Sequence, residues 1–74
     1  MGLGSYREDG ALTPRCITVL AGAARGETIR ETAARLHVSP KTVELERRVA
    51  VSRVGGRNLT NAVVIAIARG LVEP

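Results

Sequence analysis

Residues 28–43 read Thr-Ile-Arg-Glu-Thr-Ala-Ala-Arg-Leu-His-Val-Ser-Pro-Lys-Thr-Val, and they contain the signatures of two successive helix starts. Thr28 is a candidate N-cap, and Glu31 lies three residues on, where a capping box requires it. Ser39 is the second candidate N-cap, and Pro40 follows at the first helical position, where a missing N–H is tolerated. Two capped helices joined by a short turn predict a helix-turn-helix, whose second helix commonly enters the DNA major groove.

Similar capping signals predict four helices in all. Thr, Ser or Asn marks the starts, and Gly marks most of the ends. The predicted helices span residues 14–24, 29–36, 40–54 and 59–69. No segment alternates apolar and polar residues as a strand would, so the expected fold class is all-α. Residues 1–11 contain three Gly and no apolar period, and we expect a flexible N-terminal arm there, followed by one domain over residues 12–74.

The core is expected to be aliphatic, because the chain has no Trp or Phe and one Tyr. In the first helix the predicted core stripe is Ile17, Leu20, Ala21 and Ala24, with Cys16 half-buried. In the third helix it is Val43, Ala50 and Val54, with Arg47 filling the gap between them. Thr32 should lie inside its helix face, its hydroxyl bonded to a backbone carbonyl one turn earlier or to water. Leu71 and Val72 are expected to fold back as an apolar latch.

A longer pattern of residues matches a known type of domain. Its specific part is Ala33-Ala34-Arg35-Leu36 followed by Val38-Ser39-Pro40-Lys41-Thr42-Val43. The other matching residues are Leu12-Thr13-Pro14-Arg15, Gly26, Glu31, Gly55, Arg57, Thr60 and Ala62-Val63. The chain thus resembles the LuxR/NarL/GerE-type DNA-binding domain, without gaps, from Leu12 to about Val72. The resemblance implies a four-helix domain whose third helix reads DNA and whose fourth supplies a face for pairing two domains.

Three departures from that pattern indicate a divergent member. Cys16 stands where the family commonly has Glu, Thr32 where it prefers Ile, and Glu46 where it commonly has His. Glu44 and Glu46 are both expected early on the DNA-facing helix. A carboxylate close to a phosphate costs on the order of 1 kcal/mol at 4 Å in a water-like dielectric.

The candidate DNA-binding residues lie on the recognition helix, at the helix caps and just after the recognition helix. Lys41 and Arg48 can pair with phosphate or with guanine. Thr42 can contact a phosphate or a thymine methyl group, and Glu44 can accept from the amino group of cytosine. The alternative for Lys41, Glu44 and Arg48 is a solvated face with helix-supporting charge pairs. The full set is Thr28, Ser39, Lys41, Thr42, Glu44, Leu45, Arg47, Arg48, Arg57 and Thr60.

Charge and composition favour binding to nucleic acid over catalytic activity. The net charge is +4, and residues 41–57 hold five basic side chains against two acidic ones. One Cys and one His are too few ligands for a zinc site, so we expect no bound metal. No motif supports catalysis, so we expect no cofactor and no enzymatic activity. No apolar run approaches the roughly 18 residues of a membrane span, and the expected compartment is the bacterial cytoplasm, at the nucleoid.

The fourth predicted helix is richer in apolar residues than one buried face needs. Either it is fully packed, or part of it is a homodimer seam, as the resemblance also implies. The seam candidates are Val63, Val64 and Ile67.

Three functional hypotheses follow. The preferred one is a stand-alone, dimeric, sequence-specific transcription regulator that binds double-stranded DNA through residues 40–54. The alternative is a helix-turn-helix interaction module that binds a sigma factor, RNA polymerase or another regulator, with weak or no DNA binding. The third hypothesis is that the chain is the excised effector domain of a longer regulator.

Overall fold

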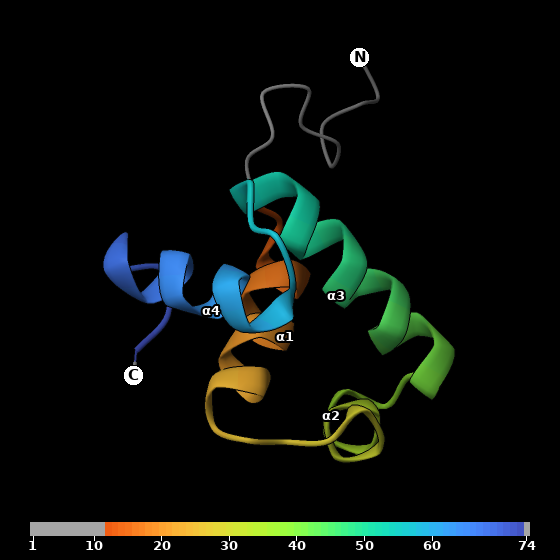
Figure 1. Ribbon diagram of the computed structural model, residues 1–74. Coiled ribbons are helices and arrows are strands. Elements are labelled where there is room, and N and C mark those ends of the chain that lie inside the picture. The colour runs from red at the N-terminus through yellow and green to blue at the C-terminus, as the bar shows by residue number, and fades with distance from the viewer. Residues whose placement is uncertain (1–11, 74) are drawn as a thin grey trace.

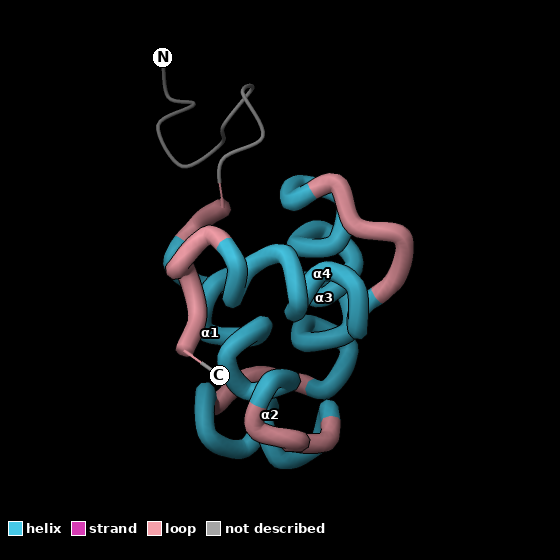
Figure 2. Tube along the Cα trace, turned by 60° about the vertical axis from the view of Figure 1, so that its left-hand side comes forward, coloured by secondary structure: helices cyan, strands magenta, loops and turns pink. Residues whose placement is uncertain are grey.

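The computed structural model describes residues 12–73, which form an all-α domain of four helices with no strand in that range. The helices are α1 (Pro14–Ala24), α2 (Ile29–Leu36), α3 (Pro40–Val54) and α4 (Leu59–Ala68). They are joined by short loops and turns (Figures 1 and 2). The predicted fold class is therefore confirmed over this range. The arm predicted at residues 1–11 lies outside the described residues.

Each helix starts at a side-chain cap. The Thr13 hydroxyl accepts from the Cys16 amide at 3.2 Å, and the Ser39 hydroxyl accepts from the Thr42 amide at 3.2 Å. The capping box of α2 is complete. The Glu31 amide donates to Thr28 Oγ1 at 3.1 Å, and the Thr28 amide donates to Glu31 Oε1 at 2.8 Å. These bonds satisfy amides that have no partner inside the helix.

Two of the helices, α2 and α3, have a C-cap residue in the left-handed conformation. Gly55 closes α3 at φ 76°, a conformation that Gly adopts without a steric penalty. His37 closes α2 at φ 59°, although it is not Gly. The last helix ends at Ala68, one residue earlier than predicted, because Arg69 is its C-cap and the turn passes through Gly70 at φ 75°.

The longest helix, α3, packs against each of the other three helices. Figure 1 shows α2 next to the N-terminal end of α3, and α4 against α1. The larger core cluster lies around the second half of α3 and comprises Cys16, Leu20, Ala50, Val54, Ala62, Ala66 and Val72. A smaller cluster joins α1, α2 and the first half of α3, and its buried members are Val19, Ala33 and Val43.

Three expectations about the core need correction. Cys16 is fully buried, and Val19, which the predicted stripe omitted, is fully buried as well. Both corrections follow from the two clusters, because α1 is covered by neighbours on more than one side. Of the predicted latch, Val72 is in the core at 5% exposure, whereas Leu71 is 38% exposed.

Candidate nucleic-acid interface

The outer side of α3 is a continuous exposed surface. Its residues repeat at three and four positions, which places them on one side of a helix, opposite the buried Val43, Ala50 and Val54. Leu45 is 46% exposed and Val49 is 38% exposed. The exposed residues are Lys41, Glu44, Leu45, Arg48, Val49 and Ser52.

The first turn of α3 is organised by polar contacts. Lys41 Nζ lies 3.8 Å from Glu44 Oε1, so the charge pair of the alternative interpretation is present. The hydroxyls of Thr42 and Ser39 are 3.1 Å apart and share a hydrogen bond. Arg48 is exposed one turn further along. The turn therefore presents fixed hydroxyls beside cationic side chains.

Glu46 does not share the outer side with Glu44. Its Oε1 accepts from the Cys16 thiol on α1, with 3.5 Å between sulfur and oxygen. Two residues along a helix turn the side chain by about 200°, so the two carboxylates point to different sides. Both carboxylates lie in the first half of α3, as expected, but only Glu44 is on its outer side.

Arg47 also turns inward. Its Nη2 donates to the backbone carbonyl of Glu27 at 3.0 Å, and its Nε is buried without a hydrogen-bond partner among residues 12–73. The side chain therefore joins α3 to the loop before α2, as its place in the predicted inner stripe implies. Its contact with DNA stays a prediction.

The remaining candidates lie on three other segments. Thr28 is exposed, and its hydroxyl serves the capping box. Arg57 is exposed in the turn after α3, where its amide donates to Asn61 Oδ1 at 2.9 Å. Thr60 is exposed on α4 and lines a groove between α1 and α4. The structure thus brings Ser39, Lys41, Thr42, Glu44, Leu45 and Arg48 together at the start and outer side of α3, and it places Thr60 with the dimer candidates.

Glu27 lies at the centre of a polar cluster that no local sequence pattern indicates. Its carboxylate accepts from Thr32 Oγ1 at 2.7 Å, from Arg35 Nη2 at 2.9 Å and Nε at 3.1 Å, and from Arg25 Nη2 at 3.1 Å. Hydrogen bonds from Arg35 and Thr32 lower the pKa of the Glu27 carboxyl to about 2. Thr32 is fully buried, and its hydroxyl binds this carboxylate instead of the expected backbone carbonyl or water.

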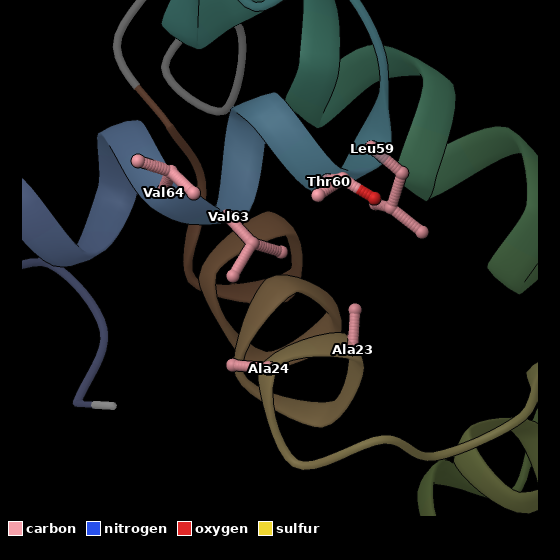
Figure 3. A pocket seen from close by; sticks show the side chains of 6 residues that line it. All are labelled: Ala23, Ala24, Leu59, Thr60, Val63 and Val64. Carbon is pink, nitrogen blue, oxygen red and sulfur yellow. The ribbon is translucent and has the colours of Figure 1, made fainter.

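The three dimer candidates differ in exposure. Val63 and Ile67 are half-buried and pack against the larger core cluster, whereas Val64 is 57% exposed. Beside Val64 lies an open apolar groove of about 190 Å³. Figure 3 shows Val63 extending from α4 toward the last turn of α1. The groove is lined by Ala23, Ala24, Leu59, Thr60, Val63 and Val64.

Within residues 12–73, no group of three or more His, Cys, Asp or Glu side chains is placed to hold a metal ion. None of the described helices has the length and apolar character needed to cross a membrane.

Two relatives resemble this chain over most of its length. One is "Response regulator RamR" of Streptomyces coelicolor, 44% identical over 59 residues, which cover 80% of this chain and 29% of the relative. The other is "Transcriptional activator protein BjaR1" of Bradyrhizobium diazoefficiens, 33% identical over 63 residues, which cover 85% of this chain and 26% of the relative. The chain therefore matches less than a third of either relative's length. The family model of the bacterial regulatory proteins of the luxR family, GerE, matches residues 10–66, and with the four capped helices this match shows that the chain belongs to the luxR family.

Proposed function

We propose that this chain is a sequence-specific, DNA-binding transcription regulator that acts as a dimer in the bacterial cytoplasm. The observation that carries the proposal is the outer side of α3, which follows a capped turn and presents Lys41, Leu45 and Arg48 to solvent. A helix with this exposure and these side-chain types suits the major groove. The names of the two relatives, a response regulator and a transcriptional activator, support the same proposal.

The residues have distinct roles in this proposal. Arg48 and Lys41 pair with phosphate or with the acceptors of guanine, while Leu45 contacts a thymine methyl group. The N-cap residues Thr28 and Ser39 hold helix N-termini, whose amides favour a nearby phosphate. Arg57 contacts DNA beyond the recognition helix, whereas Thr60 lines the groove between α1 and α4. Of the two carboxylates of α3, only Glu44 lies on the outer side, because Glu46 is turned toward α1.

Dimerisation would occur through α4. Val64 is the most exposed large apolar side chain described, and it borders the groove between α1 and α4. An exposed apolar strip beside a mostly apolar groove suits the same surface of a second copy. In this arrangement the half-buried side chains of Val63 and Ile67 add apolar contacts at the edge of the strip.

The first test is selection of the purified chain on random duplexes at 50 and 200 mM salt. We expect a recovered motif with two related half-sites. A protein with about 6–10 phosphate contacts loses roughly 10³–10⁵ in affinity across this salt range. Retention with no motif would reduce the proposal to non-specific binding. A complete absence of retention at low salt would overturn it.

A second candidate function is supported by one observation. Leu45 and Val49 form an apolar pair on the outer side of α3, and the Lys41–Glu44 ion pair partly neutralises its first turn. Such a surface also suits a protein, so the alternative is an interaction module for a sigma factor, RNA polymerase or another regulator. In that case the selection returns no DNA, and the chain co-sediments with its protein partner.

A further inference from the structure

Glu27 connects three helices of the domain. Its carboxylate receives hydrogen bonds from the C-cap of α1, through Arg25, and from α2, through Thr32 and Arg35. Its backbone carbonyl receives the Arg47 guanidinium of α3 at 3.0 Å. Its backbone amide donates to the Gly22 carbonyl of α1 at 3.0 Å. One loop residue therefore links the two helices of the helix-turn-helix to α1.

The Glu27 carboxylate lies close to Gly22 of α1. A methyl group added at Gly22 would collide with Glu27 Oε1, and it would lie 3.0 Å from Thr32 Oγ1 and 3.1 Å from Arg35 Nη2. Gly22 is buried in the last turn of α1, although Gly is a poor helix former. Glycine at this position thus leaves the room that the Glu27 cluster occupies against α1.

Few apolar side chains are fully buried where α1, α2 and the first half of α3 meet. The cluster that joins α1, α2 and the first half of α3 has Val19, Ala33 and Val43 as its buried members. Ile29, Leu36 and Val38 pack against it from partly buried positions, and apolar contacts of this kind are not directional. Charge-assisted hydrogen bonds are directional, and the paired bonds from one guanidinium add geometric specificity. A binding surface needs its residues held to about 0.5 Å by such supporting bonds.

We propose that Glu27 is a positioning residue for the recognition helix. Its carboxylate fixes the loop between α1 and α2, the fixed loop presents its carbonyl to Arg47, and Arg47 sets the orientation of α3. This role rests on the proposed function of α3 in reading DNA. Glu27 itself does not touch DNA in this arrangement.

The test uses Glu27→Gln, with Glu73→Gln as the matched control. Both variants remove one negative charge, and Glu73 is exposed near the end of the chain. Charge alone would strengthen DNA binding by both variants, because each becomes more basic. If Glu27 positions α3, Glu27→Gln instead loses about tenfold in the affinity ratio of selected to random duplex, the loss of roughly one misplaced base contact. Circular dichroism at the same temperature checks that both variants are folded.

A second variant isolates geometry from charge. Gly22→Ala changes no ionisable group and improves helix propensity, yet it displaces the Glu27 carboxylate. We expect the same fall in the affinity ratio with retained helicity. An unchanged ratio in the folded Glu27→Gln variant overturns the positioning role while leaving DNA binding by the wild-type chain intact.

A measurement without DNA keeps the inference separate from the proposed function. The amide ¹H–¹⁵N spectrum of Glu27→Gln should show shifted signals along residues 40–48 of α3, and that of Glu73→Gln should not. If the shifts stay within residues 25–35, Glu27 does not position α3. If the wild-type chain recovers no DNA motif, the proposed function fails, and the shifts in α3 alone decide the role of Glu27.

Discussion

Two consecutive arginines of α3 have different environments. The Arg47 guanidinium lies half-buried and donates to a backbone carbonyl, whereas Arg48 is exposed on the outer side of the helix. The difference follows from the 100° turn per residue of a helix. Glu44 and Glu46 differ for the same reason, since Glu46 accepts from Cys16 while Glu44 pairs with Lys41. Residue type alone does not separate the members of either pair.

Reversing the charge at Arg48 should abolish sequence-specific DNA binding. Arg48→Glu removes a cation from the outer side of α3 and places a second carboxylate beside Glu44. Loss of one base contact costs about 1–3 kcal/mol, and repulsion from phosphate adds to it. Titration of a fluorescent duplex carrying the selected motif measures the loss.

Arg69→Glu is the matched control, because it makes the same charge change at the C-cap of α4. We expect a much smaller loss of affinity for this variant. Equal losses in both variants would mean that net charge alone governs binding. Normal binding by Arg48→Glu would show that the outer side of α3 is not the recognition surface.

Stability at acid pH should depend on Glu27. Its pKa is about 2 in the folded chain, against an ordinary value of 4.5, so its carboxylate stabilises the fold fully above pH 4.5. That contribution is lost as the pH falls from 4.5 toward 2. Urea unfolding across this window should show a steeper decline in the free energy of unfolding for the wild-type chain than for Glu27→Gln. Parallel declines would contradict the hydrogen-bonded carboxylate.

At the scale of single elements, local sequence is a good guide. The four N-caps are Thr, Ser or Asn, the residue types that mark the predicted helix starts, and each side chain accepts the amide three residues on. These motifs involve residues three apart, so they need no tertiary contact. The sequence pattern places the end of α4 one residue late, because Arg69 is a good helix former and gives no local stop signal.

Removing the cap of α3 should destabilise the whole domain. Ser39→Ala leaves the Thr42 amide without its side-chain acceptor and costs about 1 kcal/mol. For a domain of 60–100 residues this lowers Tm by roughly 4–8 °C. Ser52→Ala is the control, since Ser52 is exposed inside α3 and Ala is the better helix former there. Thermal unfolding of both variants measures the difference. A cap role for Ser39 is refuted if the two variants melt together.

At the scale of the molecule, four short helices cannot enclose every apolar residue. A chain of this length buries only about 60% of the surface that its unfolded form exposes. The core is made of Ala, Val, Leu and Cys, and Val64 stays 57% exposed on α4. This exposed valine is the feature of the surface that a second copy would cover.

Val64→Glu should convert a dimer to a monomer with little loss of helicity. A charge at the centre of an apolar seam has no partner there and opposes its burial. Val49→Glu makes the same change on α3 and should leave the oligomeric state alone. Sedimentation of both variants over a range of concentrations measures the shift. If Val64→Glu sediments as the wild-type chain does, the seam is elsewhere. Loss of the circular dichroism signal would contradict the prediction that the charge separates the two copies without unfolding them.

Much of the fold was determined by the sequence alone: the four helices, their caps, the inner stripe of α3 and the family resemblance all follow from patterns within a few residues. Periodicity and capping are local, so they survive without knowledge of the partner helices. Tertiary structure decided what local patterns cannot encode. It buried Cys16 and Val19 by covering α1 on more than one side, and it turned Glu46 toward α1. It also assembled the Glu27 cluster from residues as far apart as Gly22 and Arg47, because that contact depends on how α1, α2 and α3 meet in space.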